Sequence, residues 1–185
     1  MRIVAGTYRG RHFDVPRTFK ARPTTAFAKE NLFNVLRAYV DFDSETPAAL
    51  DLFAGTGSIT LELLSRGCSS VTAVELDAQH ARLIRSFIDT LGESERAQVL
   101  RADVLRYLAR PAAKRFSFIF ADPPYALPQL ADLPRLVLSS GLLAPGGLFV
   151  LEHGSDHDFS DHPLCIDHRS WGSVNFTIFR TTADD

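Results

Sequence analysis

The sequence predicts a doubly wound α/β domain built on a mostly parallel sheet, and three observations lead to this fold class. Strand-like apolar segments alternate with helical patterns along the body of the chain, as they do in a sheet with crossover helices. The first of these strands, residues 48–53, runs directly into a turn with two glycines, residues 54–57. The length of 185 residues and the hydrophobic fraction of 45% suit one well-buried domain.

The first predicted elements precede this body. Residues 2–15 alternate loosely and contain two glycines, which fits a short hairpin. A helix opens at residues 22–25, where a threonine can cap it, and apolar side chains recur at helical spacing through Tyr39. Residues 41–47 are polar and end in a proline, so we expect a linker there.

The body is predicted to alternate strands with helices and to close with two consecutive strands. The predicted strands are residues 48–53, 70–75, 98–102, 115–121, 147–152, 164–169 and 173–180. The predicted helices are residues 58–66, 77–91, 104–109 and 130–139. Because no helix separates the last two strands, we expect them to form an antiparallel pair at the end of a parallel sheet.

Charge is distributed unevenly along the chain. Residues 1–37 hold eight basic and two acidic residues, a formal charge of +6, whereas the remainder holds 12 basic and 20 acidic residues, a charge of −8. Such asymmetry indicates a basic arm for polyanions on a more acidic body. The alternative is an ordinary solvated surface. We expect residues 1–43 to form the basic arm and residues 44–185 to form the body.

The composition also bears on compartment and partners. No apolar run approaches the roughly 18 residues that cross a bilayer, and the first residues lack a secretory leader. Two cysteines are too few for a disulfide framework, so we expect reduced thiols in a cytoplasmic protein. No feature of the sequence indicates an oligomer interface, and we expect a monomer without a membrane partner.

The glycine-containing turn forms the first motif. Gly55 and Gly57 let a ligand approach the backbone, and Glu75 ends the next strand where a carboxylate can accept both hydroxyls of a ribose. The third glycine of a dinucleotide motif is missing, and Asp51 would repel a phosphate and accept an ammonium group. The ligand implied is an adenosine with a cationic amino-acid tail, which describes S-adenosylmethionine. A tight turn without a ligand is the alternative.

The second motif, Asp122-Pro123-Pro124-Tyr125, follows the strand at residues 115–121. Two prolines hold the chain stiff and extended, so that the Asp122 carboxylate and a backbone carbonyl offer two acceptors beside an aromatic ring. Two convergent acceptors suit an exocyclic amine, and the ring suits a flat base. The alternative is a proline-bounded loop with a core tyrosine.

With these motifs the chain resembles the amino-methylating class I methyltransferases, in which a Pro-Pro-aromatic motif lines the target-base pocket. More narrowly, it is similar to the bacterial RsmD family of 16S rRNA (guanine-N2)-methyltransferases. The matching stretches are residues 2–6, 9–11, 22–25, 30–34, 50–57, 63–67, 74–77 and 122–125. The N-terminal stretches discriminate this family, since many methyltransferases share the others. Residues 27–29 depart from it, because family members carry a more charged segment there.

The resemblance implies a Rossmann-like class I fold, S-adenosylmethionine as cofactor, and 16S rRNA in the small ribosomal subunit or its assembly intermediate as partner. The implied cofactor-binding residues are Asp51, Phe53, Ala54, Gly55, Thr56, Gly57, Glu75, Leu76, Asp103 and Val104. The implied catalytic residues are Asp122 and Pro123, which would hold the target amine, and Tyr125, which would stack on the base. The implied substrate-binding residues are Arg9, Arg11, Arg22, Thr24, Thr25 and Asn34.

Two other functions remain open from the sequence. The Asp-Pro-Pro-Tyr motif also serves adenine-N6 methyltransferases on DNA or RNA, and a ribosome assembly factor could bind the cofactor or a nucleotide without turnover. Four histidines lie in an aspartate-rich stretch that we expect to be a solvated loop, and we expect no metal there. These are His153, His157, His162 and His168.

Overall fold

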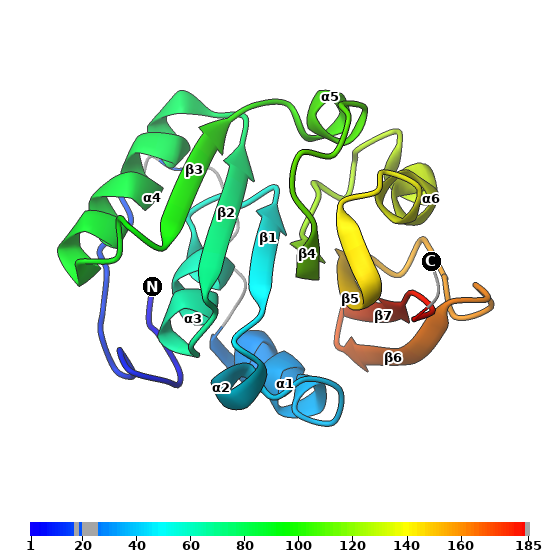
Figure 1. Cartoon of the computed structure of the whole chain (residues 1–185), viewed down its shortest axis with the longest axis horizontal. Helices are drawn as coiled ribbons and strands as arrows, with labels where there is room; N and C mark the ends of the chain where they lie inside the picture. Colours follow the sequence, from blue (N-terminus) through cyan, green and yellow to red (C-terminus); the bar gives the residue numbers. More distant parts are fainter. Residues whose placement is uncertain (17–18, 20–25, 184–185) are drawn as a thin grey trace.

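The computed structural model describes residues 1–16, 19 and 26–183, and a seven-stranded sheet forms its middle layer (Figure 1). The strands are β1 (Ala48–Leu52), β2 (Ser70–Glu75), β3 (Ala97–Arg101), β4 (Phe116–Ala121), β5 (Leu143–His153), β6 (Cys165–Trp171) and β7 (Val174–Arg180). Their order across the sheet is β3-β2-β1-β4-β5-β7-β6. The pairs from β3 to β5 are parallel, and β7 pairs antiparallel with β5 and β6. The predicted fold class is confirmed.

Helices cover both faces of the sheet. The first face carries α1 (Ala26–Leu36), α3 (Ser58–Ser65) and α4 (Ala78–Leu91), whose apolar side chains share one buried cluster. The second carries α5 (Val104–Leu108) and α6 (Leu133–Leu138), the latter preceded by the 3-10 turn η1 (Leu130–Asp132). The crossover helices α3 and α4, which join β1, β2 and β3, thus lie on the first face, and α5 and α6, which join β3, β4 and β5, lie on the second, as in a doubly wound sheet. The carboxyl ends of β1, β2 and β3 point to the top of Figure 1.

A short helix replaces the linker that the sequence predicts at residues 41–47. Helix α2 (Phe42–Glu45) begins after Asp41, whose carboxylate accepts a hydrogen bond from the Asp43 backbone N–H at 3.1 Å. Phe42 is buried, and its ring centroid lies 5.7 Å from that of Phe33 and 5.5 Å from that of Phe118. A single apolar residue in a polar run gives no periodicity, so the sequence pattern did not predict this turn.

The predicted hairpin at residues 2–15 is reduced to one antiparallel bridge between Arg2 and His12. The segment packs against α3 and α4. Ser65, the last residue of α3, accepts the Thr7 backbone N–H on its carbonyl oxygen at 2.7 Å and the Tyr8 N–H on its Oγ at 2.9 Å. None of the helices in the described part of the chain is long and apolar enough to cross a membrane.

Candidate active site

The turn after β1 takes an unusual backbone path. Phe53, Gly55 and Gly57 have φ angles of 59°, 56° and 81°, the left-handed region that side chains disfavour. Backbone hydrogen bonds hold this path: Ala54 donates to the Val74 carbonyl at 3.1 Å, and Gly57 donates to the Ala54 carbonyl at 2.8 Å. A Cβ on Gly57 would lie 2.9 Å from Cγ1 of Ile84, so packing also requires glycine there.

Glu75 joins this turn to the end of β2. Its carboxylate accepts the Gly55 backbone N–H at 2.7 Å on Oε2 and the Asp77 N–H at 2.7 Å on Oε1. His80 Nδ1 lies 3.8 Å from Oε1. The two backbone bonds fix the carboxylate at the carboxyl edge of the sheet. Because a carboxylate has about four acceptor sites, it retains the capacity to accept two ribose hydroxyls.

Asp51 is a buried acid at the centre of the same edge, with 1% of its surface exposed. The pKa of Asp51 is raised to about 7, chiefly by burial and to a smaller extent by the nearby charges of Asp122 and Glu75. Thr60 Oγ1 donates to Oδ2 at 2.5 Å, which opposes that rise. Carboxylates from three different strand ends therefore act on one another electrostatically. A cation bound among them would favour their ionised forms.

The other sequence-predicted cofactor residues lie beside these strand ends. Leu76 follows Glu75, and 62% of its surface is exposed, which is unusual for a large apolar side chain and suits contact with a flat ring. The Asp103 carboxylate caps α5 by accepting the Arg106 backbone N–H at 2.8 Å. Val104 is buried against the second face of the sheet.

The Asp122–Tyr125 motif directly follows β4. The Asp122 backbone N–H donates to the Leu52 carbonyl at 3.3 Å, which ties the motif to the end of β1. Pro123 is buried, whereas Tyr125 is 40% exposed. The Tyr125 hydroxyl donates to Oε1 of Glu152 at 3.2 Å, and Tyr125 packs against Gly154.

Sequence reasoning missed Glu152 as a site residue. It was counted as the end of a strand, and no motif singled it out. The available signal was its position, since an acid at the end of a buried parallel strand occupies the same edge as Glu75.

Of the six predicted substrate residues, the three that the structure describes do not lie beside the strand-end residues. Arg9 and Arg11 are exposed in the turn bonded to Ser65, at the end of α3 remote from the glycine turn, about 10 Å along the helix axis. Asn34 is exposed on the third turn of α1. Arg22, Thr24 and Thr25 lie outside the described residues.

The expectation of a solvated histidine loop is wrong for two of the four histidines. His153 ends β5 and is fully buried, with Nδ1 2.9 Å from the Gly154 carbonyl oxygen and Nε2 2.9 Å from Thr177 Oγ1. His168 lies on β6, 3.1 Å from the same hydroxyl. Across the described ranges, no three histidine, cysteine or acidic side chains are grouped as a metal site. His153 ends β5 one residue beyond the strand predicted at residues 147–152, and His168 lies within the strand predicted at residues 164–169, so both side chains belong to the sheet.

The fold and the strand-end residues define this protein as a class I methyltransferase of the type that uses S-adenosylmethionine. Its family follows from comparison with known proteins. A family model described as Conserved hypothetical protein 95 matches residues 1–180, so the chain belongs to that family. The match confirms the resemblance to the RsmD family that the sequence motifs suggested.

The relatives of this chain agree with that assignment. The chain is 36% identical to the Ribosomal RNA small subunit methyltransferase D of Haemophilus influenzae, over 97% of this chain and 93% of that one. A solved structure of a Thermus thermophilus protein is 34% identical, with a TM-score of 0.82 over 97% of this chain and 98% of that one. An RNA methyltransferase from Salinibacter ruber, solved with S-adenosyl-L-homocysteine, shares the fold at 17% identity, with a TM-score of 0.65 and coverage of 87% and 94%.

The donors present at the carboxyl edge fit S-adenosylmethionine. The buried Asp51 carboxylate, held beside two other acids, calls for a cation such as the amino-acid ammonium group. The fixed Glu75 carboxylate suits a ribose diol, and the exposed Leu76 suits an adenine ring. Gly55 has no Cβ, so a ligand can approach the backbone of the turn closely at that position.

Proposed function

We propose that this protein transfers the methyl group of S-adenosylmethionine to the exocyclic N2 amine of a guanine in 16S rRNA. The observation that carries this proposal is the attachment of the Asp122–Tyr125 motif to the cofactor turn. The Asp122 backbone N–H donates to the Leu52 carbonyl on β1. The charge of Asp122 also contributes to the raised pKa of Asp51. An amine acceptor and a cofactor-binding acid therefore occupy one small region at the strand ends.

The chain's own residues mainly position the reactants. Bound S-adenosylmethionine would supply a sulfonium methyl group that is already activated for transfer. The Asp122 carboxylate and the Pro123 carbonyl would accept hydrogen bonds from the target amine and orient its lone pair. The carboxylate also stabilises the positive charge that develops on the nitrogen, before a proton is lost to solvent. Tyr125, exposed beside Asp122, would stack on a base turned out of its helix.

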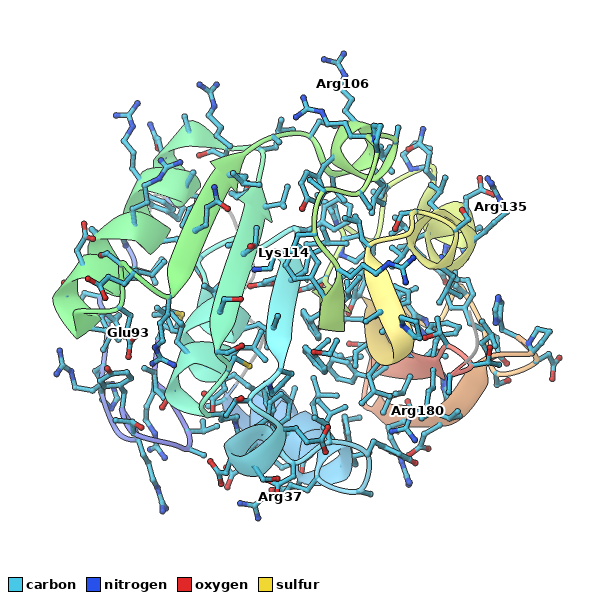
Figure 2. All side chains as sticks on the ribbon, in the orientation of Figure 1. Arg37, Glu93, Arg106, Lys114, Arg135 and Arg180 are labelled. Atoms are coloured by element: carbon cyan, nitrogen blue, oxygen red, sulfur yellow. The ribbon has the colours of Figure 1, made fainter. Side chains whose placement is uncertain are left out.

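A polyanionic partner is supported by cations near the same edge. Arg101 ends β3, and Arg106 and Arg110 lie on or just after α5; all three are exposed. Figure 2 shows Arg106 pointing away from α5 at the end to which β1, β2 and β3 point in Figure 1. Residues 1–43 would add a basic arm to the methyltransferase domain of residues 44–185. The relative from Haemophilus influenzae is named for small-subunit rRNA, which supports this partner and a cytoplasmic setting.

Mapping the methylated nucleoside tests the proposal. Purified protein is incubated with labelled S-adenosylmethionine and small ribosomal subunits, their assembly intermediates or naked 16S rRNA, and the RNA is digested to nucleosides. N2-methylguanosine is the expected product. N6-methyladenosine would identify the adenine-N6 alternative instead. Cofactor binding without label in any RNA would indicate an assembly factor and contradict the proposal.

A further inference from the structure

Glu152 lies beside Asp122 at the end of the neighbouring strand. The parallel register of β4 and β5 pairs Ala121 with Leu151, so Asp122 and Glu152 each follow a paired residue by one position. Neighbouring strands lie about 4.8 Å apart, and side chains at matching positions leave the sheet on the same side. Two acids thus stand next to each other at the edge that carries the Pro-Pro-Tyr motif.

The Tyr125 hydroxyl connects Glu152 to the base-stacking ring. It donates to Oε1 of Glu152 at 3.2 Å, although only 6% of Glu152 is exposed. Because the hydroxyl lies at the rim of the ring, a base stacked on Tyr125 comes within reach of the same carboxylate. A carboxylate with about four acceptor sites can take this bond and another one from the base.

Guanine and adenine differ at the atom that such a carboxylate would meet. The Watson–Crick edge of guanine presents the N1–H donor beside the N2 amine. The adenine edge presents its N6 amine beside N1, which is an acceptor. Two adjacent acids therefore match the two adjacent donors of guanine, whereas they would place a negative charge against the N1 lone pair of adenine.

We propose that Glu152 is a specificity-determining residue that accepts the N1–H of the target guanine, while Asp122 and the Pro123 carbonyl hold its N2 amine. This inference rests on the proposed function and names the group that selects guanine. A base without N1–H leaves the buried Glu152 carboxylate facing a lone pair, and that mismatch costs transition-state binding.

The competing explanation is that Glu152 only orients the Tyr125 ring. Tyr125→Phe separates the two roles, because it keeps the ring and the Glu152 carboxylate but removes the hydroxyl that joins them. If Glu152 only orients the ring, Tyr125→Phe and Glu152→Gln affect methylation in the same way. If Glu152 reads N1–H, base selectivity changes in Glu152→Gln and is retained in Tyr125→Phe.

The experiment uses 2-aminopurine, which has the 2-amine of guanine but an acceptor at N1. Wild type, Glu152→Gln and Tyr125→Phe are compared on small-subunit rRNA carrying guanine or 2-aminopurine at the mapped target, as a fragment or in a reconstituted particle. Wild type should favour guanine about 100-fold in kcat/KM. Glu152→Gln, whose amide can donate to N1, should reduce this preference at least tenfold, with S-adenosylhomocysteine affinity and thermal unfolding close to wild type.

Several results would overturn the inference. Equal kcat/KM of the wild-type protein for guanine and 2-aminopurine would overturn it. This comparison needs no variant, so the inference can be tested even if Glu152→Gln fails to fold. A loss of activity in Glu152→Gln that is the same for both bases, or a matching change of preference in Tyr125→Phe, also contradicts it. If wild type methylates neither base, the proposed function itself has failed.

Discussion

Lys29 and Glu62 form an ion pair inside the protein, with Lys29 Nζ 3.1 Å from Glu62 Oε2 and side chains that are 1% and 0% exposed. Lys29 Nζ also donates to the Arg2 carbonyl at 2.8 Å and to Ser58 Oγ at 3.2 Å. Ser58 is the first residue of α3, directly after the glycine turn. This one ammonium group therefore connects α1, the N-terminal segment and the helix that supports the cofactor turn.

Glu62 is the centre of this cluster. Its carboxylate also accepts the backbone N–H groups of Val4 at 2.9 Å and Ala5 at 3.1 Å, and Nε of Arg66 at 2.9 Å. Burial lowers the pKa of Lys29, and the charge of Glu62 opposes that shift. Because Lys29 is enclosed here, it is not one of the cations that the N-terminal segment offers to RNA.

Removing the Lys29 charge should destabilise the protein. Lys29→Met leaves Glu62 buried with one cation fewer, and we expect the free energy of unfolding to fall by about 3 kcal/mol. Urea denaturation measures this, with Glu30→Gln as the control because Glu30 is an exposed neighbour on α1. A loss below about 1 kcal/mol would show that the other donors to Glu62 suffice.

Lys29 also illustrates what sequence patterns can predict. Glu75 was predicted as a site residue because strand alternation and the glycine turn fix its place in the fold without any knowledge of packing. Lys29 is one of the eight basic residues of the predicted basic arm, and its burial could not be predicted, because its partner Glu62 is 33 positions away on another helix and no local pattern joins the two. Glu152 and Phe42 were missed for the same reason: their roles depend on contacts across strands and between helices.

The carboxylate of Asp122 should be needed for methyl transfer and not for cofactor binding. We expect Asp122→Ala to abolish methylation of small ribosomal subunits, since the target amine loses an acceptor, and to leave S-adenosylhomocysteine affinity within a few-fold of wild type. Methylation assays and calorimetry measure the two effects. Near-normal turnover in this variant would show that the Asp122 carboxylate is not required for methyl transfer.

Asp51 should make stability depend on pH. Its pKa is about 7 in the folded protein against an ordinary value of 3.8, so between about pH 4 and pH 7 the folded state binds a proton that the unfolded state lacks. The free energy of unfolding therefore falls by a few kcal/mol as pH rises through this window. Asp51→Asn should lack this component, which denaturation at several pH values measures.

The same ionisation should strengthen cofactor binding. An ionised Asp51 attracts an ammonium group, so wild-type affinity for S-adenosylhomocysteine should rise from about pH 6 to about pH 8, and Asp51→Asn should show a flatter profile. Parallel pH profiles for the two proteins in calorimetry would contradict this role of Asp51.

The exposed arginines of the N-terminal turn should contribute to RNA affinity from a distance. Replacing Arg9 and Arg11 by alanine removes two cations that lie away from Asp122, and a ribosomal substrate is large enough to reach both regions. We expect weaker RNA binding and a logarithmic salt dependence shallower by about 1.5. Arg135→Ala is the control, since Arg135 is exposed on α6 on the other face of the sheet (Figure 2). An unchanged salt dependence for the double variant would show that Arg9 and Arg11 belong to an ordinary solvated surface and do not contact the RNA.

Gly154 should control the position of the Tyr125 ring. A Cβ at Gly154 would lie 3.0 Å from Cδ2 and 3.4 Å from Cε2 of Tyr125, so an alanine forces the ring to move by a few tenths of an ångström. Gly154 is not among the glycines with positive φ, and a side chain there does not strain the backbone. We therefore expect Gly154→Ala to change the free energy of unfolding by less than about 1 kcal/mol.

The expected effect of Gly154→Ala on catalysis is selective. A displaced ring stacks poorly on the target base, so KM for the RNA should rise by about tenfold while S-adenosylhomocysteine affinity stays unchanged, because base stacking is worth about 1–3 kcal/mol. Ser155→Ala serves as the control, since Ser155 is the exposed next residue. A Gly154→Ala protein with wild-type KM would mean that the ring position, and with it the contact between Tyr125 and the base, does not determine substrate binding.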